Sequence, residues 1–143
     1  MTVNNTELTK DIENLGTVIQ IQQRQQDYIL VKNSEGIFKL CLADIVYCES
    51  YNSSVTFNLK NGQSVFTSVF SLKKCEEMLP LEAGFFRVHS KYLINLFMVK
   101  AYTSGKEGGA IEFMTSKNKV CIARKRKEAF LKAFYKFSIN NND

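Results

Sequence analysis

Apolar and polar residues alternate along most of the chain, and this period of two is the pattern of half-buried β-strands. Gly, Asn, Asp and Ser cluster between the alternating runs, as expected of turns. The runs predict strands over residues 17–21, 28–32, 36–40, 44–50, 55–60, 65–70, 99–102, 110–114 and 120–123. Strands and helices do not alternate regularly, so the sequence predicts a mainly β fold of small antiparallel sheets.

One hairpin turn and three helical segments complete the predicted elements. Asn61-Gly62 lies between two alternating runs and predicts a hairpin with a type I′ turn, in which both central residues have positive φ. Ser71 is a predicted N-cap for a helix that Pro80 ends. Apolar residues at helical spacing predict a closing helix over 129–137, whose phenylalanines we expect in the core, and a short stripe over 8–19.

The length of 143 residues fits a single domain with its own core. We expect a flexible N-terminal segment or linker over 1–16, a domain over 17–138 and a disordered tail over 139–143. No apolar run approaches the roughly 20 residues of a membrane-spanning helix, and the N-terminus lacks the pattern of a secretory signal. A cytoplasmic protein without a membrane partner is therefore the expectation.

Charge is unevenly distributed along the chain, which carries a net charge of +5. Residues 1–80 hold seven Lys or Arg against nine Asp or Glu, whereas residues 81–143 hold twelve against five. Between residues 117 and 136 eight basic side chains face a single acidic one, Glu128. Such a basic surface suits phosphates, although a solvated, solubilising face has the same composition.

Neither catalysis nor a metal or other cofactor is predicted. The four cysteines form no C-x-x-C pair and are expected to be reduced core thiols. The chain has no glycine-rich phosphate loop. Ser90 is adjacent to His89, and on a strand two neighbouring side chains would point to opposite faces rather than form a nucleophile–base pair.

Three segments bring small polar or basic side chains to the predicted ends of strands, and together they suit a nucleic-acid surface. They are residues 51–54, residues 89–91 with Asn95, and residues 124–127. Arg and Asn can each bind a base edge through two hydrogen bonds, while Lys, Ser and His typically hold phosphate oxygens. Two structural alternatives stay open: a core histidine at His89 and a turn-closing amide at Asn95.

The segment from Phe85 to Asn95 resembles the signature of the LytTR-type DNA-binding domain, approximately F-x-R-x-H-x-S-x-x-x-N. Phe85, Arg87, His89 and Asn95 are in register, and Lys91 occupies the usual serine position. Four further segments resemble the family in the same order, so that the similarity covers roughly residues 18–137. They are residues 44–50, 60–62, 71–80 and 120–124.

The resemblance implies an elongated fold of small antiparallel sheets, with two or three short helices, whose loops enter successive major grooves of double-stranded DNA. By position, Arg124 corresponds to a base-reading arginine. The remaining residues expected at DNA are Asn52, Ser53, Ser54, His89, Ser90, Lys91, Asn95 and Lys125. Lys91 is expected at a phosphate, and Ala123 stands where the family usually has serine.

The implied function is sequence-specific transcription regulation in a two-component system. The implied partners are direct repeats in promoter DNA, a second copy of the chain on that DNA, and an upstream receiver domain or sensor kinase. Residues 1–16 are too short for a receiver, so we expect either a stand-alone regulator or the C-terminal half of a response regulator. The alternative from another class is a β-rich protein-interaction domain whose basic face meets an acidic partner.

Overall fold

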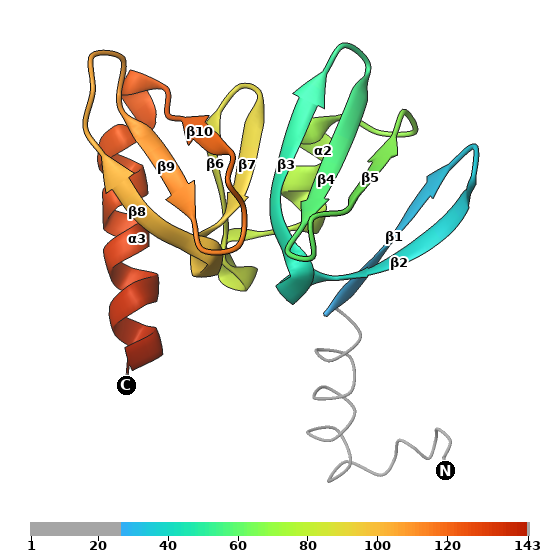
Figure 1. Ribbon diagram of the computed structural model, residues 1–143, viewed down its shortest axis with the longest axis horizontal. Helices are drawn as coiled ribbons and strands as arrows, with labels where there is room; N and C mark the ends of the chain where they lie inside the picture. Colours follow the sequence, from blue (N-terminus) through green and yellow to red (C-terminus); the bar gives the residue numbers. More distant parts are fainter. Residues whose placement is uncertain (1–26, 143) are drawn as a thin grey trace, which may run out of the picture.

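The computed structural model describes residues 27–142, with ten strands and two α-helices in that range (Figure 1). The predicted helical stripe over 8–19 and strand over 17–21 lie outside the described residues. The strands are β1 (Tyr28–Asn33), β2 (Gly36–Cys41), β3 (Ile45–Tyr51), β4 (Ser54–Leu59), β5 (Ser64–Thr67), β6 (Phe85–His89), β7 (Tyr92–Asn95), β8 (Val99–Thr103), β9 (Ala110–Phe113) and β10 (Lys119–Cys121). The α-helices are α2 (Leu72–Met78) and α3 (Lys127–Asn142), and the 3-10 turns are η2 (Leu42–Asp44), η3 (Leu81–Ala83), η4 (Leu96–Met98) and η5 (Arg124–Arg126).

The strands form three antiparallel sheets, which confirms the predicted mainly β fold. A five-stranded sheet in the order β5-β4-β3-β7-β6 is central. The three-stranded sheet β10-β9-β8 lies on one side of it, and the β1–β2 hairpin lies beside β5 (Figure 1). Helix α3 lies at the opposite end of the molecule from that hairpin, so the longest axis of the molecule crosses all three sheets (Figure 1).

Two apolar clusters lie on either side of the five-stranded sheet. One contains Cys48, Phe57 and Leu93 with Cys75 of α2, and the other contains Tyr47 and Ile94 with Phe130 of α3. Adjacent side chains on a strand point to opposite faces, so β3 contributes to both clusters. The phenylalanines of α3 belong to the second cluster or pack against it, as the sequence predicts.

The hairpin predicted at Asn61-Gly62 is confirmed, but its turn differs from the predicted type. Among the described residues Gly62 has positive φ (89°) whereas Asn61 does not. The Gly62 N–H donates to the Leu59 carbonyl at 3.0 Å, and the Leu59 N–H donates to the Gln63 carbonyl at 2.9 Å. These bonds describe a three-residue loop in which a turn is followed by a left-handed glycine. Asn61 Oδ1 accepts from the Gln63 N–H at 2.9 Å, which favours this longer loop.

Helix α2 begins where the sequence places it, whereas α3 begins at Lys127, two residues before the predicted start. Ser71 is the N-cap of α2, because its side chain accepts from the Lys74 N–H at 3.3 Å. Helix α3 continues to Asn142, so the tail expected to be disordered from residue 139 is helical as far as that residue. Polar asparagines lower helix propensity only modestly, so a helix anchored by its apolar face can extend through them.

Burial differs among the four thiols, none of which is in a disulfide. Cys48 and Cys75 are buried core thiols as predicted, whereas Cys121 is exposed and Cys41 is half-buried. Burial raises the pKa of both core thiols, that of Cys75 to about 12. In the described part of the chain, no helix is long and apolar enough to cross a bilayer.

Candidate nucleic-acid interface

Three of the sequence-predicted contact segments meet at one edge of the molecule. The β3–β4 turn, the β6–β7 turn and η5 all lie on the upper side in Figure 1, together with the β8–β9 loop. We call this surface the contact edge and define it by eight residues. They are Asn52, Ser53, Ser54, His89, Ser90, Lys91, Arg124 and Lys125.

Backbone hydrogen bonds between distant parts of the chain hold the contact edge together. The Ser50 N–H donates to the Lys91 carbonyl at 2.9 Å, which joins the end of β3 to the β6–β7 turn. The Ala123 N–H donates to the Val88 carbonyl at 2.8 Å, which joins the residue before η5 to β6. The three segments therefore have defined positions relative to one another.

The β3–β4 turn is tight, and its shape depends on Asn52. Tyr51 pairs with Ser54, so that Asn52 and Ser53 alone form the loop. Asn52 has a φ of 55°, a region that Asn tolerates better than most residues, and its side chain is exposed. Ser53 is exposed as well, whereas Ser54 is half-buried with its Oγ 3.2 Å from Ser68 Oγ. The turn therefore presents Asn52 and Ser53 more fully than Ser54.

The β6–β7 turn orients His89 by local hydrogen bonds. The Lys91 N–H donates to His89 Nδ1 at 3.1 Å, so in this geometry Nδ1 is an acceptor and Nε2 is the nitrogen that can donate. The ring packs beside Tyr92, with 5.5 Å between centroids. His89 is half-buried, which makes it neither a core histidine nor a fully exposed one, while Ser90 and Lys91 are exposed.

The expectation that His89 and Ser90 point apart is wrong. Ser90 lies in the turn rather than on the strand, and its Oγ is 3.4 Å from His89 Nδ1. A bulge in β6, where Val88 is the extra residue between Arg87 and His89, breaks the regular alternation just before the turn. The Lys91 N–H lies closer to His89 Nδ1 than Ser90 Oγ does. The contact between His89 and Ser90 therefore stabilises the conformation of the turn.

The η5 turn follows β10 and carries consecutive basic side chains. Arg124 and Lys125 are exposed. Arg124 Nη2 donates to the Lys106 carbonyl at 2.7 Å and lies 3.7 Å from the Glu107 carboxylate, both in the β8–β9 loop. Gly108 allows the β8–β9 loop to lie close to η5, because a Cβ there would collide with the backbone of residues 122 and 124. The loop thus holds Arg124 at the contact edge.

Asn95 does not belong to the contact edge, and its predicted DNA contact is corrected by its position. It ends β7 at the side of the sheet away from the β6–β7 turn, and its side chain is 2% exposed. Its Nδ2 donates to the Ile45 carbonyl at 2.8 Å and its Oδ1 accepts from the Phe97 N–H at 3.0 Å. The alternative of a turn-closing amide is therefore confirmed, since both ends of the side chain hold backbone groups.

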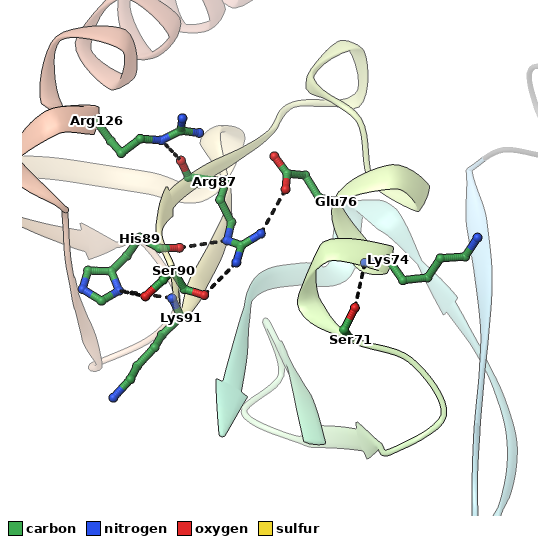
Figure 2. A network of polar contacts seen from close by, with 8 residues as sticks. All are labelled: Ser71, Lys74, Glu76, Arg87, His89, Ser90, Lys91 and Arg126. Carbon is green, nitrogen blue, oxygen red and sulfur yellow. Dashed lines mark hydrogen bonds and ion pairs between the residues drawn. The ribbon is translucent and has the colours of Figure 1, made fainter. Parts of the chain in front are cut away.

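Two residues near the contact edge are missing from the sequence-predicted set. Lys106 is exposed in the β8–β9 loop beside Arg124, and a basic residue inside a Gly-rich hairpin loop is the signal that could have revealed it. Arg87 donates to the carbonyl groups of His89 and Ser90 (Figure 2). No periodic pattern marks that role, because its acceptors are backbone atoms.

Comparison with known proteins agrees with this architecture. Residues 35–135 match the sequence profile of the LytTr DNA-binding domain. A solved structure described as the LytTr DNA-binding domain of a methyl-accepting/DNA response regulator from Bacillus cereus is similar in fold, with a TM-score of 0.64 and 18% sequence identity. That similarity covers 75% of this chain and 95% of the other. No curated protein matches the sequence.

Proposed function

The chain belongs to the LytTr DNA-binding domain family, which makes it a DNA-binding regulator of transcription, and we propose that it reads a specific duplex sequence with its contact edge. The observation that carries the proposal is the pair of bonds from Ser50 to Lys91 and from Ala123 to Val88. Because they fix the spacing of three loops on one edge, the loops can enter successive grooves on one side of a duplex.

Arg124 is the proposed base-reading residue. Its guanidinium is exposed and can donate two parallel hydrogen bonds to the O6 and N7 atoms of guanine. Asn52 and Ser53 form the second reading element, because their side chains project from a tight turn. The proposed base contacts thus come from opposite ends of the contact edge.

Four further residues of the contact edge are proposed to hold the DNA backbone. Lys91 and Lys125 are exposed point charges, which suit phosphate oxygens better than base edges. His89 Nε2 and the Ser90 hydroxyl can each donate a further hydrogen bond to phosphate. Such contacts set the register of the protein on the duplex but carry no sequence information.

Further partners are part of the same proposal. We expect direct repeats in promoter DNA, a second copy of the chain on that DNA, and regulation by a receiver domain or sensor kinase. A cytoplasmic location and the absence of enzymatic activity are expected of such a regulator.

Binding titrations at graded salt test the proposal. A duplex selected from a random-sequence library with the wild-type chain is compared with an unselected duplex by fluorescence anisotropy. Arg124→Ala should reduce affinity for the selected duplex far more than for the unselected one, because a bidentate base contact contributes about 1–3 kcal/mol of discrimination. An equal loss on both duplexes would show that Arg124 contacts only phosphate.

Lys91→Ala provides the complementary measurement. It should weaken binding to both duplexes and lower the slope of log affinity against log salt by roughly one unit. Lys60→Ala is the matched control, because Lys60 is an exposed lysine in the β4–β5 turn, at the side of the sheet away from the contact edge (Figure 1).

Asn52→Gly removes the amide while preserving the positive φ, so it separates a base contact from a backbone role. Binding to acidic protein rather than DNA would favour the protein-interaction alternative.

A further inference from the structure

We infer that Arg87, held by Glu76, is a positioning residue for DNA recognition, because it shapes the turn that presents His89, Ser90 and Lys91. The inference rests on the proposed function, since it concerns the β6–β7 part of the contact edge. Arg87 lies on β6, and Glu76 lies on α2 (Figure 2). Together they form a clamp between the helix and the turn.

All three nitrogens of the Arg87 guanidinium have acceptors. Nε donates to the His89 carbonyl at 2.8 Å, and Nη2 donates to the Ser90 carbonyl at 2.7 Å. Nη1 donates to Glu76 Oε1 at 3.0 Å. Hydrogen bonds from a charged donor are shorter and stronger than neutral ones, and the planar fork of Arg matches two neighbouring carbonyl groups.

Burial separates Arg87 from Arg124, the residue proposed to read a base. Its side chain is 20% exposed, whereas that of Arg124 is 71% exposed. The guanidinium points toward α2 and away from the exposed side chain of Lys91 (Figure 2). A phosphate would have to displace Glu76 or a backbone carbonyl to reach it. Arg87 therefore acts on DNA through the turn.

The clamp determines where the turn directs its polar groups. The carbonyl groups of His89 and Ser90 point inward to the guanidinium, and the Lys91 carbonyl accepts from the Ser50 N–H. The Lys91 N–H is bonded to His89 Nδ1. With these backbone groups occupied, the outward side of the turn consists of side chains that can donate to phosphate. Binding then requires little ordering of the turn.

The clamp also connects to η5. The Arg87 carbonyl accepts from Arg126 Nε at 2.9 Å (Figure 2). The Arg126 guanidinium lies over the Phe86 ring, 5.3 Å from the ring centroid. The same strand residue thus contacts the β6–β7 turn through its side chain and the Arg124-bearing segment through its backbone. This arrangement predicts that disturbing Arg87 affects the β6–β7 turn first.

Substitutions in the full chain test the inference. Arg87→Lys keeps a positive charge near Glu76 but lacks the fork that bonds two carbonyl groups. Glu76→Gln removes the ion pair and leaves the fork intact. Glu77→Gln is the matched control, because Glu77 is the next residue on α2 and pairs with Lys74 on the surface. Two readouts are combined: anisotropy with the selected and unselected duplexes at graded salt, and amide hydrogen exchange without DNA.

The expected result is selective for the turn. Arg87→Lys should speed exchange at the amides of Lys91 and Ser50 by about tenfold or more and reduce affinity for the selected duplex by about ten- to a hundredfold, the order expected for loss of charge-assisted bonds. The salt slope should fall by at most about one unit, as expected when the displaced turn no longer brings Lys91 to a phosphate. Glu76→Gln should give a smaller change in the same direction, and Glu77→Gln should give none.

Three results would overturn the inference. Affinity that stays at the wild-type value while exchange at Lys91 and Ser50 rises would show that the shape of the turn does not affect DNA binding. Unchanged exchange at Lys91 and Ser50 would show that the turn keeps its shape without the clamp. Exchange that rises equally throughout the sheet would indicate general destabilisation. If the wild-type chain binds no duplex in a salt-dependent way, the proposed function fails, and the exchange data still decide whether Arg87 shapes the turn.

Discussion

Replacing Asn95 with alanine should destabilise the fold without removing a DNA contact. The two backbone groups that it holds differ in exposure. The Ile45 carbonyl belongs to a fully buried residue and would lose its partner in the interior, at about 2–3 kcal/mol. Phe97 is 39% exposed, so its N–H can recover a bond to water and the loss there is about 1 kcal/mol or less. The free energy of unfolding should therefore fall by about 2–4 kcal/mol.

Urea denaturation followed by circular dichroism measures this change. With a denaturant slope of about 2 kcal/mol/M, the midpoint should fall by about 1–2 M. Asn61→Ala is the control, because Asn61 is exposed and bonds locally in the β4–β5 turn, so its effect should stay below about 1 kcal/mol. Under conditions in which Asn95→Ala is folded, its DNA affinity should equal that of the wild type. An unchanged midpoint together with lost affinity would refute the reasoning and return Asn95 to the interface.

Other measurements test single features of the molecule. Glu107→Gln should raise affinity for unselected duplexes slightly, because a carboxylate near Arg124 no longer competes with phosphate. The gain should be small, because the ion pair between Arg124 and Glu107 is exposed to solvent, and a loss of affinity would contradict this role. Gly108→Ala should lower the melting temperature, because its Cβ has no room; a wild-type value would contradict the close approach. Burial raises the pKa of Cys75 from 9.0 to about 12, so the folded state holds the thiol proton more tightly than the unfolded state does. The free energy of unfolding should therefore fall as pH rises from about 9 toward 12. Urea midpoints that stay constant over that range would exclude the effect.

Local signals in the sequence determined most of the secondary structure. Alternation places one face of each strand in a cluster of apolar side chains, and this period depends only on backbone geometry. Ser71 begins α2 because a side-chain oxygen near a free N–H needs no distant partner. The Asn61-Gly62 pair predicted a hairpin for the same reason. The type of turn depended on the number of residues in the loop. The observed three-residue loop allows the Leu59 N–H to donate to the Gln63 carbonyl.

The signature segment predicted a DNA-binding surface, which the local pattern of apolar and polar residues could not. It did not distinguish residues that can contact DNA from residues that hold the fold together. Lys91 and Asn95 are four residues apart and both polar, and the sequence placed both at DNA. The structure exposes Lys91 in a turn and buries Asn95 between Ile45 and Phe97. Side-chain type alone cannot make this distinction, because the burial of a polar group depends on partners supplied by other strands.

The assembly of the contact edge was decided by tertiary structure alone. Ser50 bonds to Lys91 and Val88 to Ala123, so each bond joins residues more than thirty positions apart. Arg87 gained its role in the same way, since Glu76 approaches it only once α2 packs on the sheet. The sequence by itself determined which side chains can meet phosphates and bases. Long-range pairing of the strands decided which of them share one surface, because such contacts form only when the whole chain is folded.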